Sequence, residues 1–339
     1  MILSVFAYSR QGSRTAGRLR PLFQEEQISM YTMEKFAEEG FLPVLKPSAP
    51  FYGEAFRQSD ALIFVGSCGI AVRQIAAFVK NKKQDPAVIC IDELGKFVIP
   101  LLSGHIGGAN ALAVRIAEQL HATPVVTTAT DINGKFSVDA WAARNGFRIS
   151  SMPAAKHVSS RILEQPVPIC SRFPIQSDLP AGTVPGDRGD LGILLSYYQE
   201  QPFAETLRLT PRVLHLGLGC RRNTEQKVIE QAVTQVFEEQ NLDFAAVKCA
   251  ASIDLKANEQ GLLAFCREKK IPIAFYTAGE LNAVPGCFTP SSFVSSVTGV
   301  DNVCERSAMV GADRLIVRKT ACNGVTVAVA EEYREVYFG

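Results

Sequence analysis

The chain has 339 residues, of which 47% are hydrophobic and 20% are charged, a composition typical of a globular protein with two or three domains. Its net charge of +1 supplies no overall field that would attract nucleic acid or an anionic membrane. No apolar run approaches the roughly 20 residues that span a bilayer, and the first apolar stretch precedes the arginines, the reverse of a secretory signal. We therefore expect a cytoplasmic protein that binds neither nucleic acid nor a membrane.

In the first half of the chain, apolar segments alternate with helical patterns. Strands are predicted at 1–8, 61–65, 87–91, 97–102 and 124–128. The alternation predicts a parallel sheet with helices on both faces, in which ligands bind at the carboxyl ends of the strands. Turns rich in glycine or hydroxyl groups follow three of these strands, at 66–69, 103–108 and 127–131. If the strands are parallel, the three turns lie at one edge of the sheet.

The turn at 103–108 carries the strongest chemical signal. It joins an apolar strand to an amphipathic helix, and three of its six residues are glycine, so its backbone N–H groups are suited to binding an anion. His105, in the middle of the turn, titrates near neutral pH. An ordinary turn with His105 as a solvated or capping side chain fits the same pattern. Neither the GxGxxG nor the GxxxxGK[ST] spacing is present, which argues against a nucleotide site.

The pattern weakens over 148–210, where a helix at 159–163, short strands at 166–169 and 193–196, and a long loop at 173–192 are predicted. A second strong unit begins at 211. A strand at 213–216 is followed by two glycines, two arginines and Thr224, a plausible helix N-cap. Arg221 and Arg222 are suited to bidentate bonds with carboxylates. A closing hairpin is predicted around Asn323 and Gly324.

These patterns predict two α/β lobes with mainly parallel sheets flanked by helices, joined by a smaller variable middle region. The expected parts are residues 1–147, 148–210 and 211–339. The nine cysteines are scattered, with no Cys-x-x-Cys pair and no cluster at zinc spacing, so we expect mostly buried or inert thiols and no metal site of the protein's own.

Two groups of motifs resemble one family. SGHIGGAN at 103–110 and TTATD at 127–131, followed by Phe136, Asp139 and Trp141, are similar to the CbiG family of cobalt-precorrin-5A hydrolases. The second half resembles the CobE/CbiG C-terminal domain through LGLGCRRNT at 216–224, ASIDLKANEQGLL at 251–263 and GVTVAVAEE at 324–332. The resemblance covers nearly the whole chain.

The resemblance implies a reaction of anaerobic cobalamin synthesis. Water opens a δ-lactone on ring A of a cobalt-bearing macrocycle, and carbon C20 leaves with its methyl group as acetaldehyde, giving cobalt-precorrin-5B. The cobalt arrives within the substrate, so no cofactor is expected. The substrate is a flat ring with many carboxylate side chains. A protein that binds it needs free backbone amides, arginines and hydroxyls, which the predicted turns offer. A homodimer and transient contacts with other enzymes of the pathway are left open.

In this hypothesis His105 is the general base that activates water, or it only positions the substrate. Asp131 or Asp92 orients the imidazole, amides near Gly107 and Gly108 stabilise the oxyanion, and Ser103 is a less favoured nucleophile. The remaining candidates are the residues of the turns and their neighbours, expected to bind the substrate: Gly66, Gly69, Arg73, Gly104, Gly107, Gly108, Asn110, Thr128, Thr130, Gly217, Gly219, Arg221, Arg222 and Thr224.

The three other histidines of the chain carry weaker signals than His105. His121, His157 and His215 lie in less distinctive contexts, and His215, inside an apolar strand, is expected to be a core residue with satisfied hydrogen bonds. The alternatives to a hydrolase are a nucleotide-dependent enzyme and a non-catalytic carrier or scaffold for corrinoids.

Overall fold

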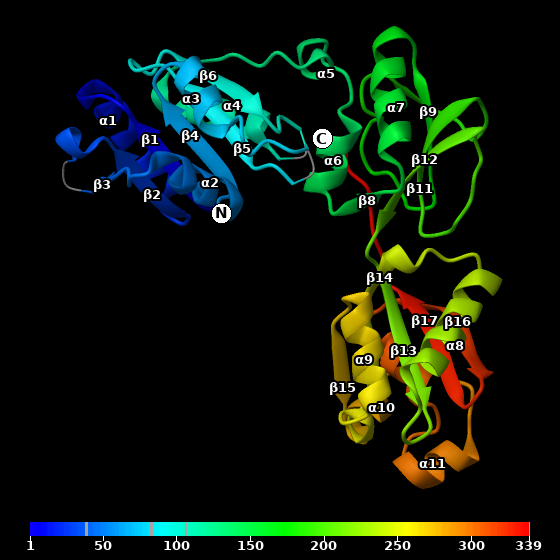
Figure 1. The fold of residues 1–339 in the computed structure, drawn as a ribbon. Coiled ribbons are helices and arrows are strands. Elements are labelled where there is room, and N and C mark those ends of the chain that lie inside the picture. Colours follow the sequence, from blue (N-terminus) through cyan, green and yellow to red (C-terminus); the bar gives the residue numbers. More distant parts are fainter. Residues whose placement is uncertain (38–39, 82–83, 106, 339) are drawn as a thin grey trace. The chain divides into compact units, whose positions relative to one another are not determined.

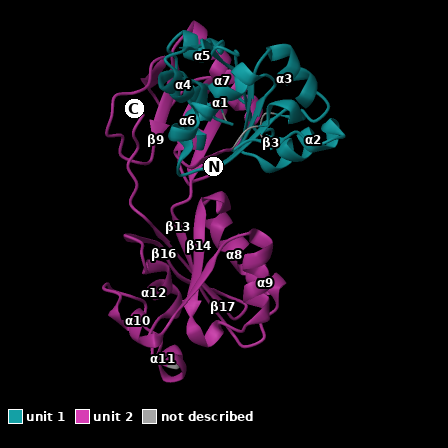
Figure 2. Cartoon of the chain, turned by 90° about the vertical axis from the view of Figure 1, so that its left-hand side faces the viewer, with its two compact units in different colours: residues 1–143 teal, residues 144–339 magenta. Residues whose placement is uncertain are grey.

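The computed structural model describes residues 1–37, 40–81, 84–105 and 107–338. The chain divides into two compact units, Met1–Ala143 and Arg144–Gly339 (Figure 2). Within the described residues, one sheet of seven strands lies in the first unit and two sheets of five strands lie in the second. The expected middle region and C-terminal part therefore belong to one unit, and the middle region has a sheet of its own. The fold class, mainly parallel sheets flanked by helices, is as predicted.

The sheet of the first unit has the strand order β3-β2-β1-β4-β5-β6-β7 (Figure 1). Its pairs are parallel except for β5 and β6, among the residues that the structure describes. The strands are β1 (Ile2–Ala7), β2 (Gln27–Thr32), β3 (Leu42–Pro43), β4 (Ala61–Val65), β5 (Ala87–Ile91), β6 (Phe97–Leu102) and β7 (Thr123–Pro124).

Helices cover both faces of this sheet because successive strand residues point to opposite sides. One core joins Val5 and Ile63 to Ile116 of α4, and the other joins Phe64 to Phe56 of α2. Burying one such side chain stabilises the fold by about 1.5–3 kcal/mol. The helices of this unit are α1 (Arg10–Gly17), α2 (Ser48–Gln58), α3 (Cys68–Ile75), α4 (Ala109–Leu120), α5 (Ala129–Ile132) and α6 (Val138–Arg144), with 3-10 turns η1 (Arg20–Phe23) and η2 (Glu34–Phe36).

The connection between β5 and β6 reverses the chain. Only residues 92–96 separate the two strands, whereas a parallel pair needs a crossover of about a dozen residues or more. The Asp92 carboxylate closes the turn by accepting hydrogen bonds from the amides of Lys96 and Phe97, each at 2.6 Å. Leu102 consequently pairs with Val88, near the amino end of β5.

The middle sheet of the second unit has the order β10-β9-β11-β12-β8. The structure places more regular structure here than the sequence pattern predicted, including a strand inside the expected loop at 173–192. The elements are β8 (Phe147–Ile149), α7 (Met152–Glu164), β9 (Val167–Ser171), β10 (Thr183–Pro185), β11 (Leu191–Leu195) and β12 (Glu205–Pro211).

The C-terminal sheet has the order β15-β14-β13-β17-β16. The predicted hairpin is confirmed: Asn323 and Gly324, both with positive φ, join β16 to β17. The strands are β13 (Leu214–Cys220), β14 (Val247–Ile253), β15 (Ile273–Tyr276), β16 (Arg314–Cys322) and β17 (Val325–Glu331). Around them lie α8 (Gln226–Glu239), η3 (Phe244–Ala246), η4 (Asp254–Lys256), α9 (Gln260–Lys269), α10 (Ala278–Ala283), α11 (Ser292–Thr298) and α12 (Val303–Met309).

Candidate active site

The turn that carries His105 lies between β6 and α4. Its backbone is fixed by hydrogen bonds from the Ala109 amide to the Ser103 carbonyl (3.1 Å) and from the Asn110 amide to the Gly104 carbonyl (3.0 Å). The Ser103 hydroxyl is buried and donates to the Asp85 carbonyl at 2.9 Å. Ser103 therefore anchors the turn to the segment before β5, which argues against its predicted alternative role as nucleophile. Ile106 of this turn lies outside the described residues.

The two later glycines of the turn meet local backbone requirements. A Cβ at Gly107 would lie 2.4 Å from the Cβ of Ser103, and Gly108, with φ of +79°, precedes the first residue of α4. The Gly108 amide donates to the His105 carbonyl at 3.0 Å. The hydrogen of one of the amides predicted to stabilise an oxyanion is thus engaged within the turn, and the oxyanion role of the amides near Gly107 and Gly108 stays a prediction.

The His105 imidazole lies between two carboxylates. Its Nε2 is 3.0 Å from Oδ2 of Asp131 and 3.3 Å from the Thr130 hydroxyl, and its Nδ1 is 3.1 Å from Oδ1 of Asp139. The Asp131 side chain is 34% exposed, while that of Asp139 is only 7% exposed. One carboxylate is thus accessible from solvent and the other is a buried support.

This arrangement favours the protonated imidazole, because an imidazolium donates from both ring nitrogens. The hydrogen bond with Asp139 is the largest influence; it raises the pKa of His105 above its usual value, and Asp131 adds to the rise, while burial opposes it. A raised pKa keeps the imidazole protonated to higher pH, and a protonated His105 cannot accept a proton from water, so this geometry favours an acid role over the general-base role. The general-base role suggested by the sequence stays a prediction.

Asp139 was not among the candidates predicted from the sequence. It lies in the first turn of α6, and its Oδ1 accepts from the Ser137 hydroxyl (3.2 Å) and the Ala140 amide (3.0 Å). A signal was present: Asp139 is three residues before Ala142, on the face that the helix buries. A carboxylate on a buried helix face needs a partner, and here the partner is His105.

Asn110, in the first turn of α4, connects the predicted turn at 103–108 to the predicted turn at 127–131. Its Nδ2 donates to Oδ2 of Asp131 at 2.7 Å and to the Thr128 hydroxyl at 2.9 Å. The sequence-predicted residues Gly104, His105, Asn110, Thr128, Thr130 and Asp131 are therefore brought together. All of them belong to the first unit.

The prediction that three turns share one edge of the sheet is wrong. Gly66 follows β4 and donates its amide to Ile91, at the carboxyl end of β5. Because β6 runs antiparallel to β5, the His105 turn lies at the opposite edge. Gly66, Gly69 and Asp92 are consequently away from His105, and Asp92 does not orient its imidazole. Arg73 lies on α3, which begins just after Gly66, and its guanidinium lies near Gly69. It therefore belongs to the edge of the sheet opposite His105.

The predicted residues of the C-terminal sheet have different surroundings. Gly217 is buried: a Cβ there would lie 1.9 Å from the Cys304 carbonyl oxygen of α12, so close packing explains this glycine better than substrate binding. Thr224 donates its hydroxyl to the Arg221 carbonyl, and the N-cap of α8 is Glu225, not Thr224. Gly219, Arg221 and Arg222 do line a cavity of this sheet.

His215 has the satisfied core environment that was predicted. It is 6% exposed, with Nδ1 3.1 Å from the Val310 carbonyl and Nε2 2.9 Å from Glu332. His157 lies on α7 against Glu205, and His121 ends α4.

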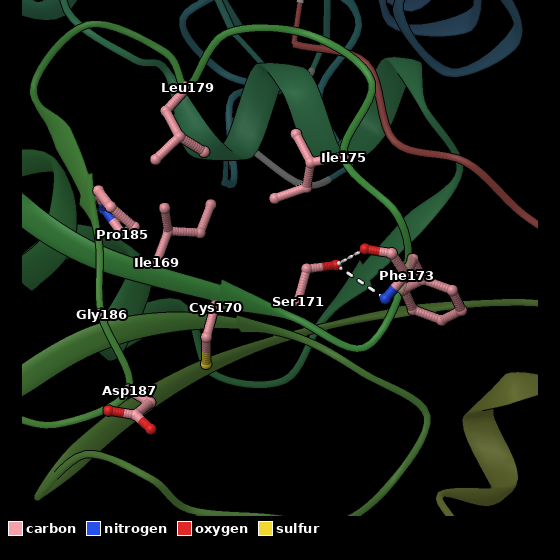
Figure 3. Close-up of a pocket in the computed structure, with 9 residues that line it drawn as sticks. All are labelled: Ile169, Cys170, Ser171, Phe173, Ile175, Leu179, Pro185, Gly186 and Asp187. Carbon is pink, nitrogen blue, oxygen red and sulfur yellow. Dashed lines mark hydrogen bonds between the residues drawn. The ribbon is translucent and has the colours of Figure 1, made fainter.

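Another cavity, of about 520 Å³, lies beside β9 in the middle sheet (Figure 3). Its walls are mainly apolar, with Ile169, Ile175 and Leu179 pointing toward one another, and the Ser171 hydroxyl bonds to the backbone of Phe173. Its charged lining residue is Asp187, and none of the described residues that line it is a cation. This cavity is unsuited to an anionic ligand.

The described residues offer neither a cluster of metal ligands nor a membrane-spanning helix. Over the described ranges, no group of three His, Cys, Asp or Glu side chains is placed to hold a metal ion. Likewise, no described helix has the length and apolarity to cross a bilayer. All nine cysteines are free, and three of them, Cys90, Cys266 and Cys304, are buried.

The fold and this cluster define an α/β protein of two units with a histidine–carboxylate site in the first. Two family models match the chain: cobalamin synthesis G N-terminal over residues 51–131 and cobalamin synthesis G C-terminus over residues 214–330. The chain belongs to this family, CbiG.

Curated relatives match along most of the chain. The cobalt-precorrin-5A hydrolase of Salmonella typhimurium is 33% identical over 342 residues, covering 96% of this chain and 97% of that protein. The cobalt-precorrin-5A hydrolase of Priestia megaterium is 31% identical, covering 96% of this chain and 94% of that protein. Protein CobE of a Sinorhizobium species is 34% identical over 121 residues, which are 34% of this chain and 79% of CobE.

Proposed function

We propose that this chain hydrolyses cobalt-precorrin-5A, with its reaction centre at His105. The observation that carries the proposal is the placement of His105 between Asp131 and Asp139, in a chain that matches named hydrolases along 96% of its length. Water opens the ring A δ-lactone, and C20 leaves with its methyl group as acetaldehyde, giving cobalt-precorrin-5B.

The geometry supports a division of work between His105 and Asp131. In the lactone-opening step, water attacks the carbonyl carbon and negative charge develops on the carbonyl oxygen. When the substrate is bound, the His105 imidazolium turns its Nε2–H from Asp131 to that oxygen, and the Asp131 carboxylate, released from this contact, accepts a proton from the attacking water. This replaces the general-base role of His105 with an acid role, and gives the base role to a group that is 34% exposed.

Asp139 is a positioning residue in this mechanism. Its contact with Nδ1 holds the imidazole ring in place and favours the charged form. Asn110 holds the other carboxylate, because its side-chain amide donates to Asp131 and to Thr128. The reacting groups are thus preorganised by residues of α4, α6 and the segment after β7.

The substrate class follows from the same proposal. A corrinoid with acetate and propionate side chains carries its own cobalt, so we propose no cofactor of the protein's own. We also propose a cytoplasmic location, supported by the nine free thiols, a state typical of reducing compartments.

The test is acetaldehyde release from cobalt-precorrin-5A by the purified chain, followed by reduction of the product with alcohol dehydrogenase and NADH. We expect His105→Ala and Asp131→Asn each to lower kcat by about 10²- to 10⁴-fold. His157→Ala, which removes an exposed histidine on α7, is the control and should retain activity. A His105→Ala variant with unchanged kcat would refute the assignment of the reaction centre.

A non-catalytic corrinoid carrier is the second candidate, favoured by Arg221 and Arg222, which line a cavity of the C-terminal sheet and could bind carboxylates without catalysis. The two candidates separate in the same assay. A carrier binds a cobalt corrinoid but releases no acetaldehyde, and its His105→Ala variant behaves as the parent chain does.

A further inference from the structure

A cavity of about 550 Å³ lies in the C-terminal part of the second unit. Residues of β13, β16, β17 and α11 are among those that line it; Figure 1 labels these elements. All of its lining residues fall between Gly219 and Thr326, inside the span of the C-terminal family model. The cavity is therefore complete within this part of the chain and does not depend on the first unit.

Positive charge dominates the lining. Arg221, Arg222, Lys256 and Lys319 line the cavity, and none of the described lining residues is Asp or Glu. Over the described ranges, no ion pair joins the side chain of Arg221, Arg222 or Lys319 to a carboxylate, whereas Lys256 lies 3.2 Å from Glu259. Most of the positive charge around the cavity is thus available to an anionic ligand.

Two described carboxylates lie near these cations, and both are engaged: Glu305 accepts from the Lys319 backbone amide at 2.7 Å, and Glu259 pairs with Lys256. Although burial raises the pKa of Glu259, the Asn223 amide and Lys256 together lower it below its usual value. Glu259 therefore stays ionised, accepts from the Asn223 amide at 2.8 Å, and neutralises Lys256 in part. It does not line the cavity.

Part of the remaining wall is apolar, and Thr298, Asn302 and Thr326 add polar uncharged groups. Ile253, Val294, Val297 and Val303 line the same cavity. Val297, on α11, is 62% exposed, which leaves a large apolar side chain at the surface. An apolar wall beside several cations suits a ligand that has both a flat apolar body and several carboxylates. A small inorganic anion, by contrast, would contact only the cations and would leave the apolar side chains exposed to water.

We propose that this cavity is a second corrinoid-binding site, which takes the acetate and propionate carboxylates at one edge of the macrocycle and packs the ring edge against Val294 and Val297. The inference rests on the proposed function for the identity of the macrocycle. Its volume of about 550 Å³ is suited to a drug-sized group, and so to an edge of this larger ligand. Arg221 and Arg222 were predicted from the sequence to hold carboxylates; the structure adds Lys256, Lys319 and the valine wall.

The experiment is a fluorescence titration of the full-length chain with uroporphyrin III, a macrocycle that carries eight carboxylates. The test variant is Arg221→Glu/Lys319→Glu. The matched control is Lys227→Glu/Arg267→Glu, which makes the same change in net charge at exposed residues of α8 and α9 outside the cavity. We expect the test variant to raise Kd by about tenfold or more and the control to change it by less than about twofold.

Further variants separate the two components of the site. Val297→Asp should raise Kd because it places a negative charge on the apolar wall. Coproporphyrin III, with four carboxylates, should bind more weakly than uroporphyrin III. If the double variant does not fold, the single variants Arg222→Gln and Val297→Asp carry the test, since both positions are exposed. Equal weakening by the test variant and the control, or equal affinity for the two porphyrins, would overturn the proposal.

Failure of this inference is distinguishable from failure of the proposed function. If the parent chain releases acetaldehyde and the cavity variants bind uroporphyrin III as tightly as the parent does, the second site is refuted while the hydrolase stands. If the parent chain releases no acetaldehyde but binds uroporphyrin III through the cavity, the hydrolase is refuted while the site stands. His105→Ala should leave uroporphyrin binding to this cavity unchanged.

Discussion

The imidazole of His105 has a carboxylate oxygen within hydrogen-bonding distance of each ring nitrogen. A single histidine in a glycine-rich turn is chemically ambiguous, but a histidine between two acids is biased toward its charged form. Whether His105 is suited to act as an acid or as a base therefore depends mainly on Asp139, which raises its pKa. Asp139 lies 34 positions along the chain from His105, on helix α6.

The first prediction concerns the pH dependence of activity. If His105 acts as an acid, activity falls as the pH rises through its pKa. Asp139→Asn removes the largest influence that raises this pKa, so the alkaline limb of the kcat profile should move to lower pH. Asp139→Glu, which retains the charge, should restore part of the shift. A profile that has no alkaline limb, or whose alkaline limb does not move in Asp139→Asn, would contradict the acid role of His105.

The second prediction concerns stability. Because the folded pKa of His105 is raised above 6.5, its protonation stabilises the fold below that value, and this contribution is lost as the pH rises through the folded pKa. The urea midpoint of the parent chain should therefore exceed that of His105→Gln by more at about pH 6 than at about pH 9. Trp141, the one tryptophan and a buried residue of α6, reports the unfolding of this unit by fluorescence.

The β5–β6 hairpin decides which turns of the first unit can meet. Its five-residue connection, residues 92–96, places the end of β6 at the amino end of β5. The length of this connection was readable from the sequence and is too short for a parallel crossover. The expectation of an all-parallel sheet overlooked this length, and so placed Gly66 and Asp92 beside His105.

The third prediction compares two glycines on strand β13. A Cβ at Gly217 would meet a backbone oxygen of α12 at 1.9 Å, whereas one at Gly219 would meet the side-chain hydroxyl of Thr326 at 2.5 Å. Backbone atoms in a packed helix move less easily than a hydroxyl rotor. Gly217→Ala should therefore lower the free energy of unfolding by about 1–3 kcal/mol or more, and Gly219→Ala by less. Urea unfolding followed by circular dichroism measures both, and equal losses would contradict the packing explanation.

The whole molecule is nearly neutral, with a net charge of +1, yet the cavity of its C-terminal sheet concentrates four cations. Attraction of an anionic ligand, as proposed for this cavity, would therefore be a local property and not one of the whole chain. Its Arg221 and Arg222 side chains are exposed, and exposed charges are screened by salt.

The fourth prediction follows from this screening. Raising the ionic strength from about 0.05 M to about 0.5 M shortens the Debye length to about 4 Å, so Kd for uroporphyrin III should rise. The Arg221→Glu/Lys319→Glu variant should lose most of this salt dependence. A salt effect of the same size in that variant would place the charged contacts elsewhere in the chain.

Local sequence patterns were sufficient to predict many of the helices and strands and some of the candidate site residues. Periodicity located several strands, the helix after His105 and the closing hairpin, because these depend on neighbouring residues. It missed β2 and β12, and the strand expected at 124–128 is only β7 at Thr123–Pro124. His105, Asn110, Thr128 and Asp131 were identified from two short motifs, and the structure places them within hydrogen-bonding distance of one another. Strand direction, the close packing at Gly217 and the support from Asp139 depend on contacts between residues distant in sequence. The protonation state of His105 follows from those contacts, since an imidazole responds to the charges that folding places around it.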